Sequence, residues 1–117
     1  MNHTVGQIGY FQLSNLVRNK VPFSLFLINV DPSQQVVPDA LKSEMEKLLA
    51  LATSAKSQTV TDVVGGMSLR SDHPIVLICG DGNASEICSK SLADRGYINV
   101  FHVAGGWKSL LAEASGG

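Results

Sequence analysis

Two short runs of apolar residues constrain the fold of this chain more than any other feature. The runs are FSLFLINV at residues 23–30 and PIVLIC at residues 74–79. Neither run alternates regularly between polar and apolar residues, and turn-forming residues end both, Asp31-Pro32 after the first and Gly80 after the second. Runs of this kind are typical of strands that are covered on both faces, as in parallel sheets. We therefore expect a parallel sheet with helices on both sides.

Three segments have the character of helices that could cover such a sheet. Apolar residues at helical spacing, or a glycine turn followed by helix-forming residues, predict helices over residues 38–56, 84–96 and 105–114. In the second of these helices we expect Ile87, Cys88 and Leu92 to face the core. Gly96 then ends the helix, because glycine readily adopts the left-handed conformation that follows a helix.

Three further segments predict strands, namely residues 7–13, 58–64 and 98–103. The segment 58–64 alternates between polar and apolar residues, which indicates an edge strand. Ser14 is a plausible N-cap for a short helix over residues 14–19. The alternation of strands and helices predicts one domain over residues 1–117, an α/β fold of three layers (α/β/α) with a mostly parallel, roughly five-stranded central sheet.

Composition excludes several classes of protein. A hydrophobic content of 44% with 16% charged residues is typical of a globular domain rather than a disordered chain. The net charge of -1 gives no basic surface for a nucleic-acid partner. No apolar stretch approaches the roughly 18 residues of a membrane span, and no signal peptide is recognisable at the N-terminus. We therefore expect no membrane association and a cytoplasmic location, where both cysteines stay reduced.

The segment CGDGNAS, residues 79–85, carries the features of a reactive site. Cys79 ends a buried strand, and ligands of open parallel sheets lie beyond the carboxyl ends of the strands. The two glycines allow the loop amides to turn inward, and the following helix adds unsatisfied N–H groups at its N-terminus. This setting should favour the thiolate and should also bind an anion carried on the sulfur. We predict Cys79 as the nucleophile, and as the substrate-binding loop the residues Gly80, Asp81, Gly82, Asn83, Ala84 and Ser85.

Other interpretations of these residues need equal weight. Cysteines that end core strands are often inert packing residues. A dinucleotide-binding loop is excluded because Ser85 stands where the third glycine would be, and a P-loop is excluded because the loop itself contains no Lys-Ser or Lys-Thr pair. Cys88 is expected to be a small packing residue, with a resolving thiol as the alternative. Two cysteines and three separated histidines show no spacing of metal ligands, so we expect no metal.

Residues 75–110 resemble a rhodanese domain in three motifs, which occur in the order and spacing of that family. They are CGDGNAS from Cys79, GYINV at residues 96–100 and AGGW at residues 104–107. Upstream, LFLINVDP is similar to the family strand that usually ends in Asp-Val-Arg, and VVPDAL faintly resembles its Ile-Pro-Gly-Ala segment.

The resemblance implies a sulfurtransferase. Cys79 would take the outer sulfur of thiosulfate or a persulfide, become a persulfide itself, and pass the sulfur to cyanide or to the thiol of another protein. Neither a metal nor an organic cofactor is implied, because the covalent intermediate carries the sulfur.

The loop departs from related loops at three positions. Cysteine phosphatases, which are related, carry an arginine at the position of Ser85, and many active rhodaneses carry one at the position of Ala84. Asp81 adds a negative charge to a loop that should receive an anion, which weakens anion binding. We therefore expect low activity on small anionic donors. The alternative function is a rhodanese-like binding or regulatory module with weakened catalysis.

Overall fold

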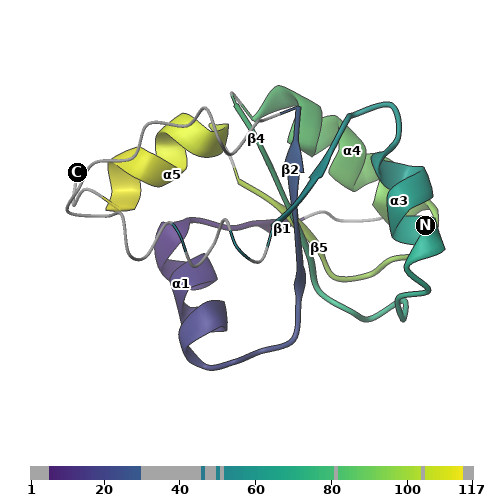
Figure 1. The fold of residues 1–117 in the computed structure, drawn as a ribbon, viewed down its shortest axis with the longest axis horizontal. Coiled ribbons are helices and arrows are strands. Elements are labelled where there is room, and N and C mark those ends of the chain that lie inside the picture. The colour runs from purple at the N-terminus through teal and green to yellow at the C-terminus, as the bar shows by residue number, and fades with distance from the viewer. Residues whose placement is uncertain are drawn as a thin grey trace.

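The computed structural model describes residues 6–29, 46, 50, 52–80, 82–103 and 105–114. Within this part of the chain, one parallel sheet contains five strands in the order β1-β5-β4-β2-β3 (Figure 1). The strands are β1 (Gly6–Gln7), β2 (Ser24–Ile28), β3 (Ala52–Ala55), β4 (Ile75–Cys79) and β5 (Val100–His102). The parallel sheet is therefore confirmed, with β4 at its centre.

Helices cover both faces of this sheet (Figure 1). They are α1 (Tyr10–Arg18), α3 (Val60–Gly66), α4 (Asn83–Asp94) and α5 (Gly106–Ala114). In Figure 1, α1 and α5 lie on one side of the strands, and α3 and α4 lie on the other. This is the α/β architecture that the sequence predicts. None of the described helices is both long and apolar enough to span a bilayer.

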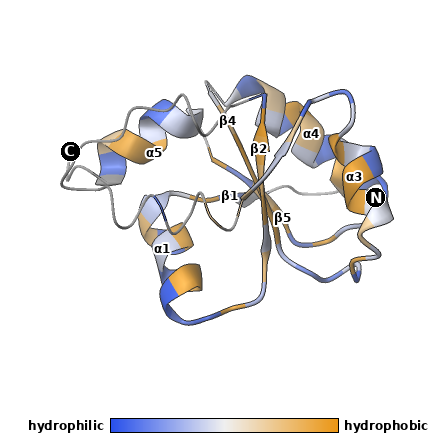
Figure 2. Ribbon diagram, in the orientation of Figure 1, coloured by the Kyte–Doolittle hydropathy of each residue, from blue (hydrophilic) through white to orange (hydrophobic). Residues whose placement is uncertain are grey.

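The core consists of two apolar clusters, one on each face of the sheet. Every residue of β4 is buried. Its side chains alternate between the clusters, with Val76 and Ile78 in the cluster beneath α1 and α5, and Leu77 and Cys79 in the cluster beneath α3 and α4. Figure 2 shows β2 and β4 as a largely hydrophobic centre between helices of mixed character. Burial on both faces explains why these strands are continuous apolar runs.

Residues 58–64 do not form the edge strand that their alternation indicates. Residues 60–66 form helix α3, in which Val60 and Val64 are fully buried. These two valines are four residues apart and so lie on the same side of a helix, where they pack onto the sheet. The edge strand beside β2 is β3, which pairs with β2 through residues 52–55. Residues 52–55 fall within the helix that the sequence predicts over residues 38–56, so that part of the prediction is wrong. Most of the rest of the predicted helix lies outside the described residues.

The first elements also differ from expectation. The predicted strand over residues 7–13 reduces to the two residues of β1, because α1 begins at Tyr10. Tyr10 and Leu13 are buried three residues apart, which is the spacing of a helix face. The N-cap is Gly9, and Ser14 lies inside the helix rather than at its start.

The buried face of α4 was predicted only in part. Leu92 and Cys88 face the core as expected, but Ile87 is 66% exposed. The remaining inward positions are occupied by Ser85, Ser89 and Ala93, small side chains that permit close packing against the sheet. Gly96 has φ of 104°, and its N–H donates to the carbonyl of Ala93, so it ends this helix as predicted.

Candidate active site

Cys79 is the last residue of β4 and lies level with Ile28, the last residue of β2. Two backbone amides of the following loop donate to its sulfur. The N–H of Gly82 lies 3.0 Å from Sγ, and the N–H of Ser85 lies 3.3 Å from it. The predicted inward turn of the loop amides is therefore present at Gly82 and Ser85. Donors in this arrangement stabilise negative charge on the sulfur.

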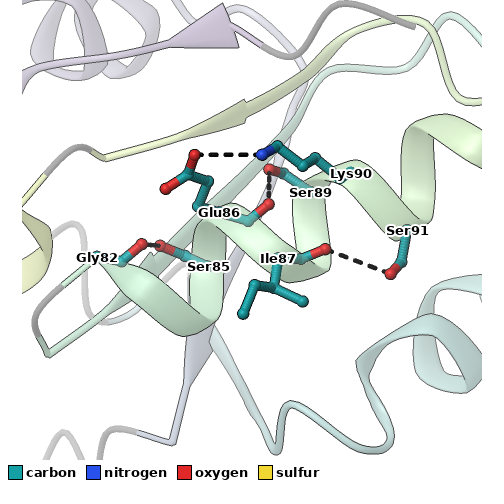
Figure 3. Close-up of polar contacts among 7 residues, drawn as sticks. All are labelled: Gly82, Ser85, Glu86, Ile87, Ser89, Lys90 and Ser91. Carbon is teal, nitrogen blue, oxygen red and sulfur yellow. Dashed lines mark hydrogen bonds and ion pairs between the residues drawn. The ribbon is translucent and has the colours of Figure 1, made fainter.

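The hydroxyl of Ser85 extends this set of contacts. Its Oγ lies 3.4 Å from Cys79 Sγ, where it accepts from the thiol. The same hydroxyl donates to the carbonyl of Gly82 at 3.2 Å, a contact drawn in Figure 3. A hydroxyl hydrogen rotates freely to suit its partners. When the thiol loses its proton, the Ser85 hydroxyl can turn and donate to the sulfur instead. Ser85 is fully buried, so water does not compete for this contact.

Glycines fix the loop against the turn that precedes α5. Gly82 has φ of 95°, and a Cβ on it would lie 2.7 Å from the backbone nitrogen of Gly105. Gly106 has φ of 69°, and a Cβ on it would overlap the carbonyl oxygen of Cys79. Only glycine satisfies both the backbone conformation and this close approach. The Gly-Gly turn therefore supports the cysteine loop through direct contact between backbones.

A shallow pocket of ≈ 480 Å³ opens in front of Cys79. The loop residues Gly80, Asn83 and Ala84 line it, together with Ile28 of β2, Asn29 directly after that strand and Lys108 of α5. Cys79 is only 2% exposed, so a reagent must enter this pocket to reach the sulfur. Of the loop residues predicted from the sequence, Asp81 lies outside the described residues.

Asn29 and Lys108 border the site although sequence reasoning did not single them out for it. Asn29 has φ of 56°, a conformation that asparagine tolerates better than most residues. Its side chain accepts from the N–H of Ser57 and donates to the Ser57 hydroxyl, so it ties the end of β2 to the segment before α3. No sequence signal indicates Lys108, because its place depends on how α5 meets the loop.

Cys88 behaves as a packing residue. It is 4% exposed, and its thiol lies 3.7 Å from the carbonyl oxygen of Ser57. Burial raises the pKa of this thiol, and the nearby charge of Cys79 raises it further. Both effects oppose the thiolate form that a nucleophile requires. Both cysteines are free thiols.

Two buried ring systems support the sheet beside the site. His102 is 5% exposed on β5, and its Nδ1 has no hydrogen-bond partner among the described residues. Burial lowers the pKa of His102. The negative charge of Glu86 raises this pKa by less, and the positive charge of Lys90 lowers it by less still. Trp107 is 4% exposed and fixes α5 in the core. His73, before β4, is half-buried, and its Nε2 lies 3.0 Å from the Ser24 hydroxyl.

The groups around Cys79 define the chemistry that the site can offer. Among the described residues, no group of three or more His, Cys, Asp or Glu side chains could hold a metal ion. The arrangement brings together a cysteine thiol, two backbone amides that donate to its sulfur, and a cationic side chain at the rim of the pocket.

Comparison with known families and structures agrees with the fold of the chain. The family model described as "Rhodanese-like domain" matches residues 24–113. Comparison with curated proteins finds no matching relative. Among solved structures, a rhodanese-like domain protein from Staphylococcus aureus is 18% identical, with a TM-score of 0.64 and 91% of each chain covered.

Two other similar structures carry different descriptions. The polysulfide-sulfur transferase homodimer from Wolinella succinogenes is 15% identical, with a TM-score of 0.65, 93% of this chain covered and 74% of that chain. A possible tyrosine phosphatase from Rhodopseudomonas palustris is 16% identical, with a TM-score of 0.63, 97% of this chain covered and 83% of that chain. At these identities the likeness concerns the fold alone, and it covers proteins of different described activities.

Proposed function

This chain belongs to the rhodanese-like domain family, and on that premise we propose that it is a sulfurtransferase or sulfur-relay protein that works through Cys79. The observation that carries the proposal is the convergence of the Gly82 and Ser85 amides on the Cys79 sulfur. The polysulfide-sulfur transferase among the similar structures shows that this fold can serve such chemistry.

The proposed reaction has two steps. In the first, the Cys79 thiolate attacks the outer sulfur of thiosulfate or of a persulfide. A bond forms between the two sulfurs, the old sulfur–sulfur bond of the donor breaks, and sulfite or a thiolate leaves with the electron pair. In the second, cyanide or a protein thiol attacks the outer sulfur of the Cys79 persulfide, and the Cys79 thiolate is released.

The loop is suited to the intermediate of this reaction. The outer sulfur of a cysteine persulfide carries negative charge, and it would project from Cys79 Sγ into the pocket. Amide donors that already converge near Sγ need little rearrangement to stabilise that charge. The Ser85 hydroxyl can add a further donor by rotating away from the Gly82 carbonyl.

We expect turnover on small anionic donors to be slow. Ala84 lines the pocket at the position where many active members of the family have an arginine. An arginine can donate two hydrogen bonds to two oxygens of one anion, which alanine cannot. Asp81 should oppose anion binding by its charge. Both residues reduce affinity for the donor rather than the reactivity of the sulfur.

A steady-state assay of thiosulfate:cyanide sulfur transfer tests the proposal. The wild-type protein should show low but measurable thiocyanate formation, and Cys79→Ser should show none. Ala84→Arg and Asp81→Asn should each increase kcat/KM, by about tenfold for the arginine if it adds one charged hydrogen bond. Activity that persists in Cys79→Ser would contradict the proposal, and no gain in either loop variant would contradict the account of donor binding.

The competing function is a rhodanese-like module that binds a partner without transferring sulfur. The 2% exposure of Cys79 favours it, as does Ala84. In that case the Cys79 thiol should resist alkylation in the folded protein. We propose a cytoplasmic location for either function, a compartment in which both cysteines would stay reduced.

A further inference from the structure

Lys108 is the one charged side chain among the described residues that line the Cys79 pocket. The loop itself supplies no cation, since the position where the family often carries arginine is Ala84. Positive charge therefore reaches this pocket from α5, a different element of the fold. An exposed lysine at the mouth of a pocket attracts anions toward it.

The backbone beneath Lys108 has a fixed position relative to the sulfur. Gly106, two residues earlier, packs directly against the backbone of Cys79 and Gly80. Trp107, the preceding residue, is 4% exposed and holds α5 in the core. The backbone of Lys108 is therefore held beside the loop, and the position of its ammonium group depends on the side-chain rotamer alone.

The charge of Lys108 is not used within the described part of the chain. Glu86 pairs with Lys90 at 3.4 Å and Asp72 pairs with Arg70 at 3.1 Å, whereas Lys108 makes no ion pair there. Lys108 also lies in the first turn of α5, where the helix dipole disfavours a cation. Helix stability therefore does not explain this lysine.

We propose that Lys108 is the specificity residue that binds the anionic end of the sulfur donor, such as the sulfonate of thiosulfate or a carboxylate near a persulfide. The proposal rests on the proposed function of Cys79 and adds the class of donor. The ammonium group of Lys108 acts as a point charge, whereas the guanidinium group of an arginine binds an anion through two parallel hydrogen bonds. It therefore gives the site a preference for anions while leaving their affinity low.

Alkylation of Cys79 by two reagents of similar shape tests this inference without sulfur transfer. Iodoacetate is an anion and iodoacetamide is neutral. The ratio of their rate constants measures the local electrostatic potential and cancels the intrinsic reactivity of the thiol. All variants carry Cys88→Ser, so that Cys79 is the only cysteine that can be alkylated. Digestion with trypsin could not separate the two cysteines for analysis, because no lysine or arginine lies between them.

In this background, Lys108→Met should lower the iodoacetate-to-iodoacetamide ratio by about threefold, and Lys108→Glu should lower it by about tenfold. High salt should abolish most of the difference. Lys90→Met is the matched control, because Lys90 is exposed on α4 and does not line the pocket. It should leave the ratio unchanged.

In the sulfur-transfer assay, Lys108→Met and Lys108→Glu should raise the KM for thiosulfate and leave kcat nearly unchanged, whereas Lys90→Met should change neither. A ratio that is identical in wild type, Lys108→Met and Lys108→Glu would overturn the role of Lys108. If the ratio shifts as expected but Cys79 never accepts sulfur, the proposed function fails while anion binding by Lys108 stands.

Discussion

Replacing Gly106 with alanine should destabilise the protein through the contact between the Gly-Gly turn and the cysteine loop. With φ of 69°, Gly106 has a left-handed backbone, which costs an alanine about 1 to 2 kcal/mol. The new Cβ would also overlap the Cys79 carbonyl oxygen and lie 2.7 Å from the carbonyl carbon and oxygen of Gly80. Because these atoms belong to the backbone, they cannot move aside as a flexible side chain could.

We expect the total loss for Gly106→Ala to be about 3 kcal/mol or more in the free energy of unfolding. Gly96→Ala is the matched control, since Gly96 has φ of 104° but a Cβ on it would meet no heavy atom of the described residues within 4 Å. It should lose only the cost of backbone strain, about 1 to 2 kcal/mol. Urea denaturation of both variants measures the difference. An equal loss of unfolding free energy in the two variants would refute the claim that close backbone contact between the turn and the loop stabilises the protein.

Three other predictions follow from single features of the structure. Ser85→Ala should slow alkylation of Cys79 by about fivefold, the effect of one hydrogen bond of roughly 1 kcal/mol, and an unchanged rate would mean that the hydroxyl does not act on the sulfur. Gly65→Ala should raise the free energy of unfolding by about 0.5 to 1 kcal/mol, because Gly65 lies within α3 and a Cβ there meets no described atom within 4 Å. Burial lowers the pKa of His102, so the unfolded chain takes up a proton at higher pH than the folded chain does. Stability should therefore fall as the pH drops below the unfolded pKa, and urea denaturation between about pH 7.5 and pH 5.5 should show a smaller fall in His102→Asn. An equal fall in both proteins would assign this pH dependence to other groups.

The parts of the fold that the sequence predicts well are those with unambiguous patterns. β2 and β4 are continuous apolar runs, which few structures other than doubly covered strands accommodate. The predicted end of α4 is confirmed because Gly96 adopts the left-handed conformation that its sequence position indicates.

The errors arise where short segments satisfy two periodicities at once. In residues 58–64, Val60 and Val64 fit an alternating strand as well as one face of a helix, and packing against the sheet selects the helix. The strand β3 has the sequence ATSA and carries no apolar run, so its pairing with β2 alone defines it. Tertiary contacts, rather than local preference, decide such segments.

The candidate site also has one part that the sequence predicts and one part that it does not. Cys79 and its loop are contiguous, so the position of the glycines and of the helix start is enough to predict amides that point at the sulfur. Lys108 enters the pocket only because Gly106 allows α5 to approach the loop backbone. That approach joins residues distant in sequence, and no spacing within the chain indicates it.

The central claim is that Cys79 accepts a sulfur atom and holds it as a persulfide. Intact-protein mass spectrometry after incubation with thiosulfate or a persulfide donor tests this most directly. The wild-type protein should gain about 32 Da, the mass of one sulfur, and the gain should vanish in Cys79→Ser or after treatment with cyanide. A protein whose mass stays unchanged with every donor, while its fold is intact, would contradict the account.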